Sequence, residues 1–486
     1  MPPAVTVLQV LSPHDIRRIH TASLDIIESV GVRFPSPRAL DIWAAHGATV
    51  DRNTSIVQVS GRLIEDALRH APPAYTLAAR DPGRDLPLDG AHVYLGTDGC
   101  GTEVLDAWTG ERRRSTLQDV ADIARVADAL DEISFQWVPV SAQDQPPETR
   151  SLHELAAIWR NTTKHVQSES VVSEREALAA IEMAAVISGG REALRRRPIL
   201  SLLVCAISPL GQDGQAVDAA LVAAEAGVPV GVLTMASCAF TGPATLAGTL
   251  AVGNAEVISA LALIQLAHPG APVYYGAAQT AMDLRTGGYT GGGPADFLFG
   301  AATNALADFY DVPLSMGAFA TGAKASDWQA GLENGLSSFM AAAVGSDMLV
   351  GAGLLHGSLI WSYEQLMLDL EIQGIVETML RGIRVDDETL ALDTIRAVGP
   401  GGDFLAQAHT KRHMRELWQG RYMDRRTLDG WEVDPGAVRG LALRRAQDLL
   451  RDHHPEPLDL ALDAELARII GASQAEAETD PSYGVD

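Results

Sequence analysis

Acidic and aromatic side chains follow several apolar, strand-like segments of this chain, and their types fit the binding of an organic cation. Asp98 and Glu169 are carboxylates that could offset a positive charge, and His356 directly follows the apolar run LVGAGLL and could move a proton. Aromatic rings attract cations through their π faces, and quaternary ammonium groups are the best-known case. The aromatic candidates near strand ends are Tyr94, Trp137, Tyr274, Tyr275 and Phe319.

Each of these aromatic rings could instead fill a layer of a buried core, which is the commoner role of such residues. Successive side chains of a strand point to opposite faces, so only one of Tyr274 and Tyr275 can face the interior of a barrel. His356 could equally be a structural hydrogen-bond donor.

A glycine-rich loop, MDLRTGGYTGGGP, follows the strand that contains Tyr274. Glycines lack a Cβ atom, so such a loop can bend sharply or move. Gln279 precedes this loop, and Asp283 and Arg285 lie at its start. Arg285, Gln279, His356 or the N–H groups of the loop could meet the anionic part of a ligand, or Asp283 and Arg285 could pair with each other and hold the loop. The loop lacks the Lys-Ser/Thr ending of a phosphate-binding loop.

These residues belong to a regular alternation of strands and helices between residues 91 and 385. Eight strand–helix units without a reversal of the pattern predict a (β/α)8 TIM barrel, whose ligands bind at the carboxyl ends of the strands. The expected strands are 92–97, 133–140, 164–170, 199–207, 228–236, 273–278, 312–319 and 347–355.

Helical segments flank the predicted barrel. Residues 1–90 are expected to form a helical extension with helices at 12–30, 36–46 and 60–70. Residues 386–486 are expected to form further helices and a disordered tail from residue 472. The long apolar segment 243–268 contains Asn, Glu and Gln, which favours a buried barrel helix over a membrane span.

Composition excludes several classes of partner. The net charge of −25 argues against nucleic acid and anionic membranes, and no signal peptide is evident, so we expect a cytoplasmic protein. The three widely spaced cysteines form neither a disulfide framework nor a metal motif. His409 and His413 are four residues apart on a predicted helix, but no third ligand is evident, so a solvated face is expected and no metal site. No strand carries the His and carboxylate spacing of a metal hydrolase.

The sequence resembles the trimethylamine methyltransferase (MttB-like) family, over about residues 11 to 418. The stretches that carry the resemblance include NTTKHV, MDLRTG, DWQAGLENG, TLAGTLAVGNAEVISALALIQLAHPGAPVYYG and GPGGDFLAQAHTKRHMRELW. The resemblance implies a (β/α)8 barrel that moves a methyl group from a methylated amine to a corrinoid (cobalamin) on a separate protein, and it implies a homo-oligomer. Trimethylamine enzymes of this family carry pyrrolysine, whereas the run LSMGAFATGAKASDWQAG has only ordinary residues. This chain is therefore similar to the non-pyrrolysine branch, which includes glycine betaine methyltransferases.

We accordingly expect a quaternary amine substrate and no tightly bound cofactor. The expected trimethylammonium pocket consists of Tyr94, Trp137, Phe319 and one of the two tyrosines, with Asp98 or Glu169 supplying negative charge. Two alternatives stay open on the sequence. The acceptor could be tetrahydrofolate rather than a corrinoid, or the protein could bind quaternary amines without catalysis.

Overall fold

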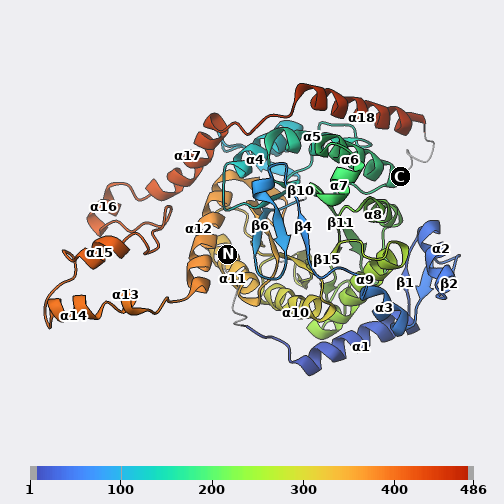
Figure 1. Ribbon diagram of the computed structural model, residues 1–486, viewed down its shortest axis with the longest axis horizontal. Helices are drawn as coiled ribbons and strands as arrows, with labels where there is room; N and C mark the ends of the chain where they lie inside the picture. The colour runs from blue at the N-terminus through green and yellow to red at the C-terminus, as the bar shows by residue number, and fades with distance from the viewer. Residues whose placement is uncertain (1–7, 100, 290, 480–486) are drawn as a thin grey trace.

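The structure is a computed structural model that describes residues 8–99, 101–289 and 291–479. At its centre, eight parallel strands form a barrel (Figure 1). The strands are β6 (Tyr94–Thr97), β9 (Phe135–Trp137), β10 (His165–Ser168), β11 (Leu200–Ile207), β13 (Val230–Thr234), β15 (Val273–Ala277), β18 (Leu314–Gly317) and β19 (Met348–Ala352). They run in the order β10, β9, β6, β19, β18, β15, β13, β11, and β11 pairs with β10 to close the barrel. The predicted (β/α)8 barrel is confirmed.

One long helix follows each strand and covers the outside of the barrel. These helices are α4 (Leu117–Asp128), α5 (Arg150–Asn161), α6 (Glu174–Ser188), α8 (Gly214–Ala226), α9 (Leu246–Ala267), α10 (Pro294–Tyr310), α11 (Trp328–Val344) and α12 (Tyr363–Arg381). Side chains such as Ser173, Asp213 and Asp327 accept hydrogen bonds from the first free backbone N–H groups. Gly189 and Gly227 end α6 and α8 in the left-handed conformation.

Helix α9 is the one described helix that is long and apolar enough to cross a membrane, but 83% of its most apolar window is buried inside the molecule. It packs against β13 on one side and against α1 (Pro13–Ser29) and α3 (Gly61–Leu68) on the other. The prediction of a buried barrel helix is confirmed.

The N-terminal region contains the three predicted helices, α1, α2 (Pro37–Ala45) and α3, and also a sheet that was not predicted. Its strands β1 (Val32–Arg33), β2 (Thr49–Asp51) and β3 (Ile56–Gln58) continue the barrel sheet through β12 (Gly211–Gln212), which pairs with β11. A hairpin of β4 (Tyr75–Leu77) and β5 (Leu86–Leu88) follows. The hydroxyl of Tyr75 donates to the carbonyl oxygen of Val273, at the amino-terminal end of β15.

Short strands surround the opposite end of the barrel. The hairpin of β7 (Glu103–Leu105) and β8 (Arg112–Arg114) turns at Gly110 and pairs with the hairpin of β20 (Leu354–Leu355) and β21 (Ile360–Ser362). A second small sheet joins β14 (Ser237–Cys238), β16 (Thr280–Asp283) and β17 (Gly288–Tyr289).

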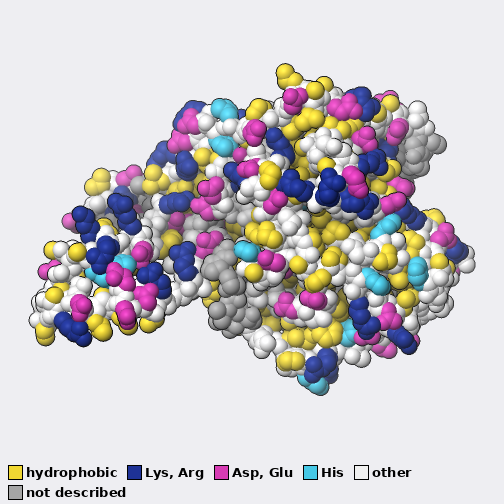
Figure 2. Space-filling view, in the orientation of Figure 1, with side chains coloured by type: hydrophobic (Ala, Val, Ile, Leu, Met, Phe, Trp, Pro, Cys, Tyr) yellow, Lys and Arg dark blue, Asp and Glu magenta, His cyan; other side chains and the backbone are white. Residues whose placement is uncertain are grey.

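After α12 the chain leaves the barrel as an arm, residues 382–436, in which no described residue is buried. The arm carries four short helices: α13 (Asp387–Leu390), α14 (Leu392–Val398), α15 (Ala408–His413) and α16 (Leu428–Val433). Figure 1 shows it reaching out to one side of the barrel, and Figure 2 shows basic, acidic and histidine side chains gathered on it.

The chain then returns to the barrel as α17 (Ala437–Asp452), which packs on α12 and α4, and α18 (Leu460–Thr479), which packs on α6. The prediction of a disordered tail from residue 472 is wrong up to Thr479. Helix α18 continues because Ser473 and Ala477 are buried, and the Arg175 guanidinium donates to the Ser473 carbonyl and hydroxyl oxygens. Residues 480–486 lie outside the described residues.

Candidate active site

Inward-facing side chains near the carboxyl ends of the strands define the candidate site, because barrels of this kind bind ligands there. On β9 the Phe135 ring lies so close to Gly96 of β6 that a Cβ atom at Gly96 would come within 2.5 Å of it. Phe135 therefore points inward, and by strand alternation so does Trp137. Gln136, between them, points outward and donates to the carbonyl oxygen of Ala124 on α4.

Three neighbouring strands present an acidic, an aromatic and an acidic residue at this end. Asp98 follows β6, Trp137 ends β9 and Glu169 follows β10. Trp137 pairs in register with Gln167, so Glu169 lies one inward position further towards the mouth than the indole. A Cβ atom at Gly99 would come within 2.4 Å of the Trp137 ring, so only a glycine lets the loop after β6 lie against the indole.

The Asp98 carboxylate is buried and held in place from two sides. Its Oδ1 atom accepts from the Gly99 amide at 2.9 Å, and its Oδ2 atom accepts from the Ser358 hydroxyl at 2.5 Å. Burial raises the pKa of Asp98 to about 6, although the hydrogen bonds from Ser358 and Gly99 oppose the rise. The side chain is therefore mostly anionic at neutral pH and close to its titration point, where a bound cation would favour the charged form.

The two adjacent tyrosines of β15 face opposite ways. The Tyr274 hydroxyl donates to Gln167 Oε1 at 2.9 Å and to the Leu202 carbonyl oxygen at 3.1 Å, so this ring crosses the barrel interior. The Tyr275 hydroxyl points outward to Asn254 Oδ1 of α9 at 3.4 Å. Of the pair, only Tyr274 lines the interior, where it forms the floor beneath the mouth.

Two buried donors lie side by side on β9 and β10. Trp137 Nε1 and Gln167 Nε2 are buried and have no hydrogen-bond partner among the described residues, and their residues are register partners on the inner face. An unpaired buried N–H group costs about 1–3 kcal/mol, so such groups are rare unless a ligand or water satisfies them. This pair therefore marks a place for a hydrogen-bond acceptor.

Cys205 is the inward thiol at the end of β11. Burial, together with the negative charge of Glu169, raises the pKa of the Cys205 thiol to about 12. The thiol is therefore protonated at neutral pH and is a poor nucleophile. The same charge acts on Tyr274, whose pKa burial also raises, which places Glu169 near both side chains.

One exposed glycine at the mouth of the barrel leaves space beside it. A Cβ atom at Gly317, at the end of β18, would meet no atom within 4 Å, and this residue is exposed. Beside the mouth, the loops after β11, β13 and β15 enclose a pocket of about 300 Å³. Met235, Phe240 and Met282 give it apolar walls, and Ser208 and Thr280 add hydroxyl groups.

Several residues predicted at the mouth lie elsewhere. Tyr94 is the first residue of β6, at the amino-terminal end of the barrel, and stacks on His92 with ring centroids 5.9 Å apart. We expected this strand to begin at residue 92, which placed Tyr94 in its middle and closer to the mouth. In the structure the strand begins at Tyr94 itself. Gln279 turns outward between α9 and α10, because the Thr303 hydroxyl donates to its Oε1 atom at 3.2 Å.

The remaining predicted residues lie around the mouth in less direct positions. Arg285 is paired with Asp283, with Nη2 and Oδ2 2.9 Å apart, which matches the alternative in which this pair holds the loop. His356 is exposed, in the turn of the β20–β21 hairpin that also places Ser358 beside Asp98. Phe319 is buried behind the end of β18, where its backbone approaches Gly351 of β19.

Sequence reasoning missed a set of buried or half-buried carboxylates that hold the loops at the mouth. Each comes from a barrel helix and accepts a backbone N–H from a loop that follows a strand: Glu154 from Ala142, Glu256 from Leu210, Glu333 from Gly322 and Asp369 from Gly353. Burial raises the pKa of Glu154 and of Asp369 to about 7 and also raises that of Glu256. The available signal was an acidic residue on the otherwise apolar face of each helix.

The mouth holds no group of three metal-ligating side chains among the described residues; the single such group lies on the arm, at Glu388, His409 and His413. The chemistry available at the mouth is therefore cation binding by carboxylates and an indole, hydrogen bonding by two unpaired donors, and positioning by fixed loops.

Comparison with known proteins finds similarity over nearly the whole chain. The model of the trimethylamine methyltransferase (MTTB) family matches residues 3–478. A trimethylamine methyltransferase MttB of Desulfitobacterium hafniense is 36% identical over 476 residues, which cover 98% of this chain and 94% of that protein. A glycine betaine methyltransferase from another strain of the same species is 32% identical, with 95% of this chain and 96% of that protein covered. Among solved structures, the hydroxylamine complex of MtmB matches with a TM-score of 0.50 and 11% identity, covering 96% of this chain and 93% of that one, which supports the fold alone.

Proposed function

Because the chain belongs to the trimethylamine methyltransferase (MTTB) family, we propose that it demethylates a quaternary amine of the betaine type and passes the methyl group to the Co(I) centre of a corrinoid protein. One relative is named for trimethylamine and another for glycine betaine, so the family alone leaves the donor open. The residues at the mouth favour the quaternary donor.

The reaction needs no protein nucleophile and no proton. The electron pair of Co(I) forms the new bond to the methyl carbon, and the C–N bond breaks and leaves its electron pair on nitrogen. A quaternary ammonium thus departs as a neutral tertiary amine, whereas a tertiary amine would have to be protonated first. The inward thiol, Cys205, is held protonated, with a pKa raised to about 12, which fits a site that works by positioning and desolvation.

The observation that carries the proposal is the Asp98–Trp137–Glu169 arrangement on three neighbouring strands. A trimethylammonium group has no N–H to donate and binds through its diffuse charge, for which an indole face and nearby carboxylates are suited. The loop at Gly99 fixes the indole, and Ser358 fixes Asp98, so both are set before the substrate arrives. A fixed headgroup leaves one methyl directed at the open mouth.

Nothing in the described part of the chain pairs with the buried N–H groups of Trp137 and Gln167, and these groups support a substrate that also carries an acceptor such as a carboxylate. In a betaine, the carboxylate lies a short carbon chain away from the ammonium group. Cation and anion subsites that share Trp137 fit that compact zwitterion better than a plain methylamine. Arg285, which was predicted for this role, is already paired with Asp283 and is exposed.

The open mouth supports an acceptor delivered from outside. Ile207 ends β11, and Met235 and Phe240 lie in the segment that follows β13; these three side chains are 57%, 47% and 71% exposed. Apolar side chains exposed together at a rim are typical of a contact surface for another protein. The carboxylates that bind the loop backbones would hold this rim in shape while a corrinoid protein docks.

The test is a methyl-transfer assay against two acceptors. Purified protein is incubated with glycine betaine, proline betaine, carnitine, choline or trimethylamine, together with either cob(I)alamin or tetrahydrofolate. Mass spectrometry then follows the demethylated amine and the methylated acceptor. The proposal expects methylcobalamin with a carboxylated quaternary amine and none with trimethylamine. Formation of methyltetrahydrofolate would show that tetrahydrofolate is the acceptor instead. Tight binding of an amine without any product would indicate a protein that binds quaternary amines without catalysis.

A further inference from the structure

The arm at residues 382–436 lacks an apolar core. None of its described residues is buried, and exposed apolar side chains such as Ile383, Leu405 and Val433 are 91%, 87% and 86% exposed. Its helices are four to seven residues long, too short to be stable by themselves. Polypeptide without a core is commonly held by a disulfide or a bound metal.

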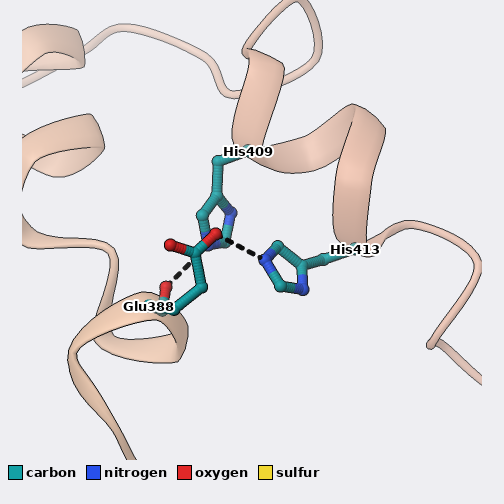
Figure 3. A group of neighbouring side chains, drawn as sticks. All are labelled: Glu388, His409 and His413. Carbon is teal, nitrogen blue, oxygen red and sulfur yellow. Dashed lines mark hydrogen bonds and ion pairs between the residues drawn. The ribbon is translucent and has the colours of Figure 1, made fainter.

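Two segments of the arm meet at three side chains that are potential metal ligands (Figure 3). Glu388 comes from α13, and His409 and His413 come from α15, one turn apart on the same face. The ligand atoms of the three lie within 4.8 Å of one another, and the two imidazole rings are 4.3 Å apart between centroids. His413 Nε2 is 3.2 Å from Glu388 Oε1, and His409 Nε2 is 3.0 Å from the Glu388 carbonyl oxygen.

We propose that Glu388, His409 and His413 bind a divalent transition metal of the zinc type and that this ion ties α13 to α15 within the arm. Two imidazoles and one carboxylate are a known zinc ligand set, with a fourth position left for water or another ligand. Donor atoms of a tetrahedral zinc site lie about 3.3 Å apart, given metal–ligand distances of 2.0–2.2 Å. Small side-chain rotations bring the three groups to that spacing.

The surroundings of His413 match those of a metal ligand. Its other ring nitrogen, Nδ1, is 3.0 Å from Glu416 Oε2, and a carboxylate on the distal nitrogen is the usual partner of a zinc-bound histidine. That contact orients the ring and leaves Nε2 directed at Glu388.

Arg412 offers the competing arrangement. Its Nη2 atom donates to Glu388 Oε1 at 2.9 Å, so an ion must share the carboxylate with the guanidinium, which can keep one oxygen while the ion takes the other. The later part of the arm is tied to α12, because the backbone N–H groups of Arg421, Tyr422 and Met423 donate to Glu371. Between α13 and α15, the Arg412–Glu388 ion pair alone would contribute little, because exposed ion pairs are worth about 0–1 kcal/mol.

The sequence shows only part of this site. The pair His409 and His413 has metal-ligand spacing, but the third ligand lies 21 residues upstream, beyond a proline- and glycine-containing loop. The folded arm brings Glu388 to the histidines and so supplies a third candidate ligand that was not evident in the sequence.

Zinc content of the full-length protein tests the proposal. The protein is stripped with a chelator, loaded with ZnCl₂, dialysed and analysed by elemental mass spectrometry. Wild type and His70→Ala, which removes an exposed histidine outside the cluster, are expected to retain the same amount of zinc. His409→Ala and His413→Ala are expected to retain one equivalent less. Equal zinc in all four proteins, or none in wild type, would overturn the proposal.

Tryptic cleavage gives a readout on wild type alone, so it does not depend on whether a variant folds. Saturating Zn²⁺ is expected to slow cleavage within the arm by about tenfold or more, because a ligand that binds only the ordered arm lowers the population of open states. Glu388→Gln, which keeps the size of the side chain, is expected to lose this protection. Cleavage of wild type at the same rate with and without Zn²⁺ would overturn the proposal.

Discussion

The hydroxyl of Tyr274 donates to the side-chain oxygen of Gln167 at 2.9 Å and so links β15 to β10 through the interior of the barrel. This hydrogen bond engages the oxygen of the Gln167 amide and leaves its Nε2 atom, like Nε1 of Trp137, without a partner among the described residues. A tyrosine at the floor of the barrel thus sets the hydrogen-bonding character of the site above it.

Tyr274→Phe is expected to destabilise the protein by about 1–3 kcal/mol, because it leaves the buried oxygen of Gln167 without its donor. Tyr275→Phe is the matched control. That hydroxyl is equally buried but makes a longer contact, 3.4 Å to Asn254, so its loss is expected to cost less than about 1 kcal/mol. Urea unfolding of both variants measures the difference. Equal losses would contradict the assigned role of the Tyr274 contact.

Trp137→Phe is expected to raise KM about tenfold for glycine betaine and to change KM for tetramethylammonium or choline much less. The phenyl ring keeps an aromatic face for the cation, whereas the Nε1 donor is lost, and a hydrogen bond to a charged group contributes about 1.5–3 kcal/mol. Steady-state kinetics with each substrate makes the comparison. An equal rise for substrates with and without a carboxylate would show that Nε1 does not contact it.

Glu169→Gln is expected to raise KM for every quaternary amine by about 10- to 100-fold, because the amide cannot offset the ammonium charge. Asp283→Asn is the control, since that carboxylate is paired with exposed Arg285 outside the interior. Isothermal titration with tetramethylammonium isolates the cation subsite. Unchanged affinity in Glu169→Gln would remove Glu169 from the pocket.

Cys205→Ala is expected to keep at least about half of the wild-type kcat. Burial and Glu169 raise the pKa of the thiol to about 12, so at pH 7 it is protonated and supplies neither a nucleophile nor a base. The assay is methyl transfer from glycine betaine. A loss of more than about a hundredfold would instead show covalent participation by the thiol.

Asp369→Asn is expected to make the free energy of unfolding fall less steeply as the pH rises. Burial raises the pKa of Asp369 from 3.8 to about 7, and nearby Asp98 adds to the rise. Between these values the folded state binds a proton that the unfolded state has lost, so stability falls by about 1.4 kcal/mol per pH unit for this group. The effect is absent below about pH 4 and complete above about pH 7. Urea midpoints at pH 5, 6, 7 and 8 should show a shallower slope in the variant, and parallel curves would contradict the assignment.

Much of the fold could be predicted because strand and helix periodicity is local. Eight apolar strands, the caps of the helices and the alternation of Tyr274 with Tyr275 are all visible in short windows of sequence. The small β1–β3 sheet escaped prediction because its strands are two or three residues long.

The site was harder to predict because it depends on where each strand begins and ends. Side chains alternate between the inner and outer faces along each strand, and Asp98, Trp137 and Glu169 occupy inward positions of this alternation. Gln279 lies in an irregular segment after β15, where side chains no longer alternate regularly between the two faces. Tyr94 is the first residue of its strand and lies at the amino-terminal end of the barrel, opposite the mouth. The roles of the inner residues in binding stay predictions until they are measured.

The most direct test of the central claim uses glycine betaine with three deuterated methyl groups, cob(I)alamin and wild-type protein. Mass spectrometry would count the trideuteromethyl-cobalamin and the dimethylglycine that retains two labelled methyl groups. The account predicts the two products in equal amounts and no labelled product when labelled trimethylamine replaces the betaine. Transfer from trimethylamine but not from glycine betaine would contradict it.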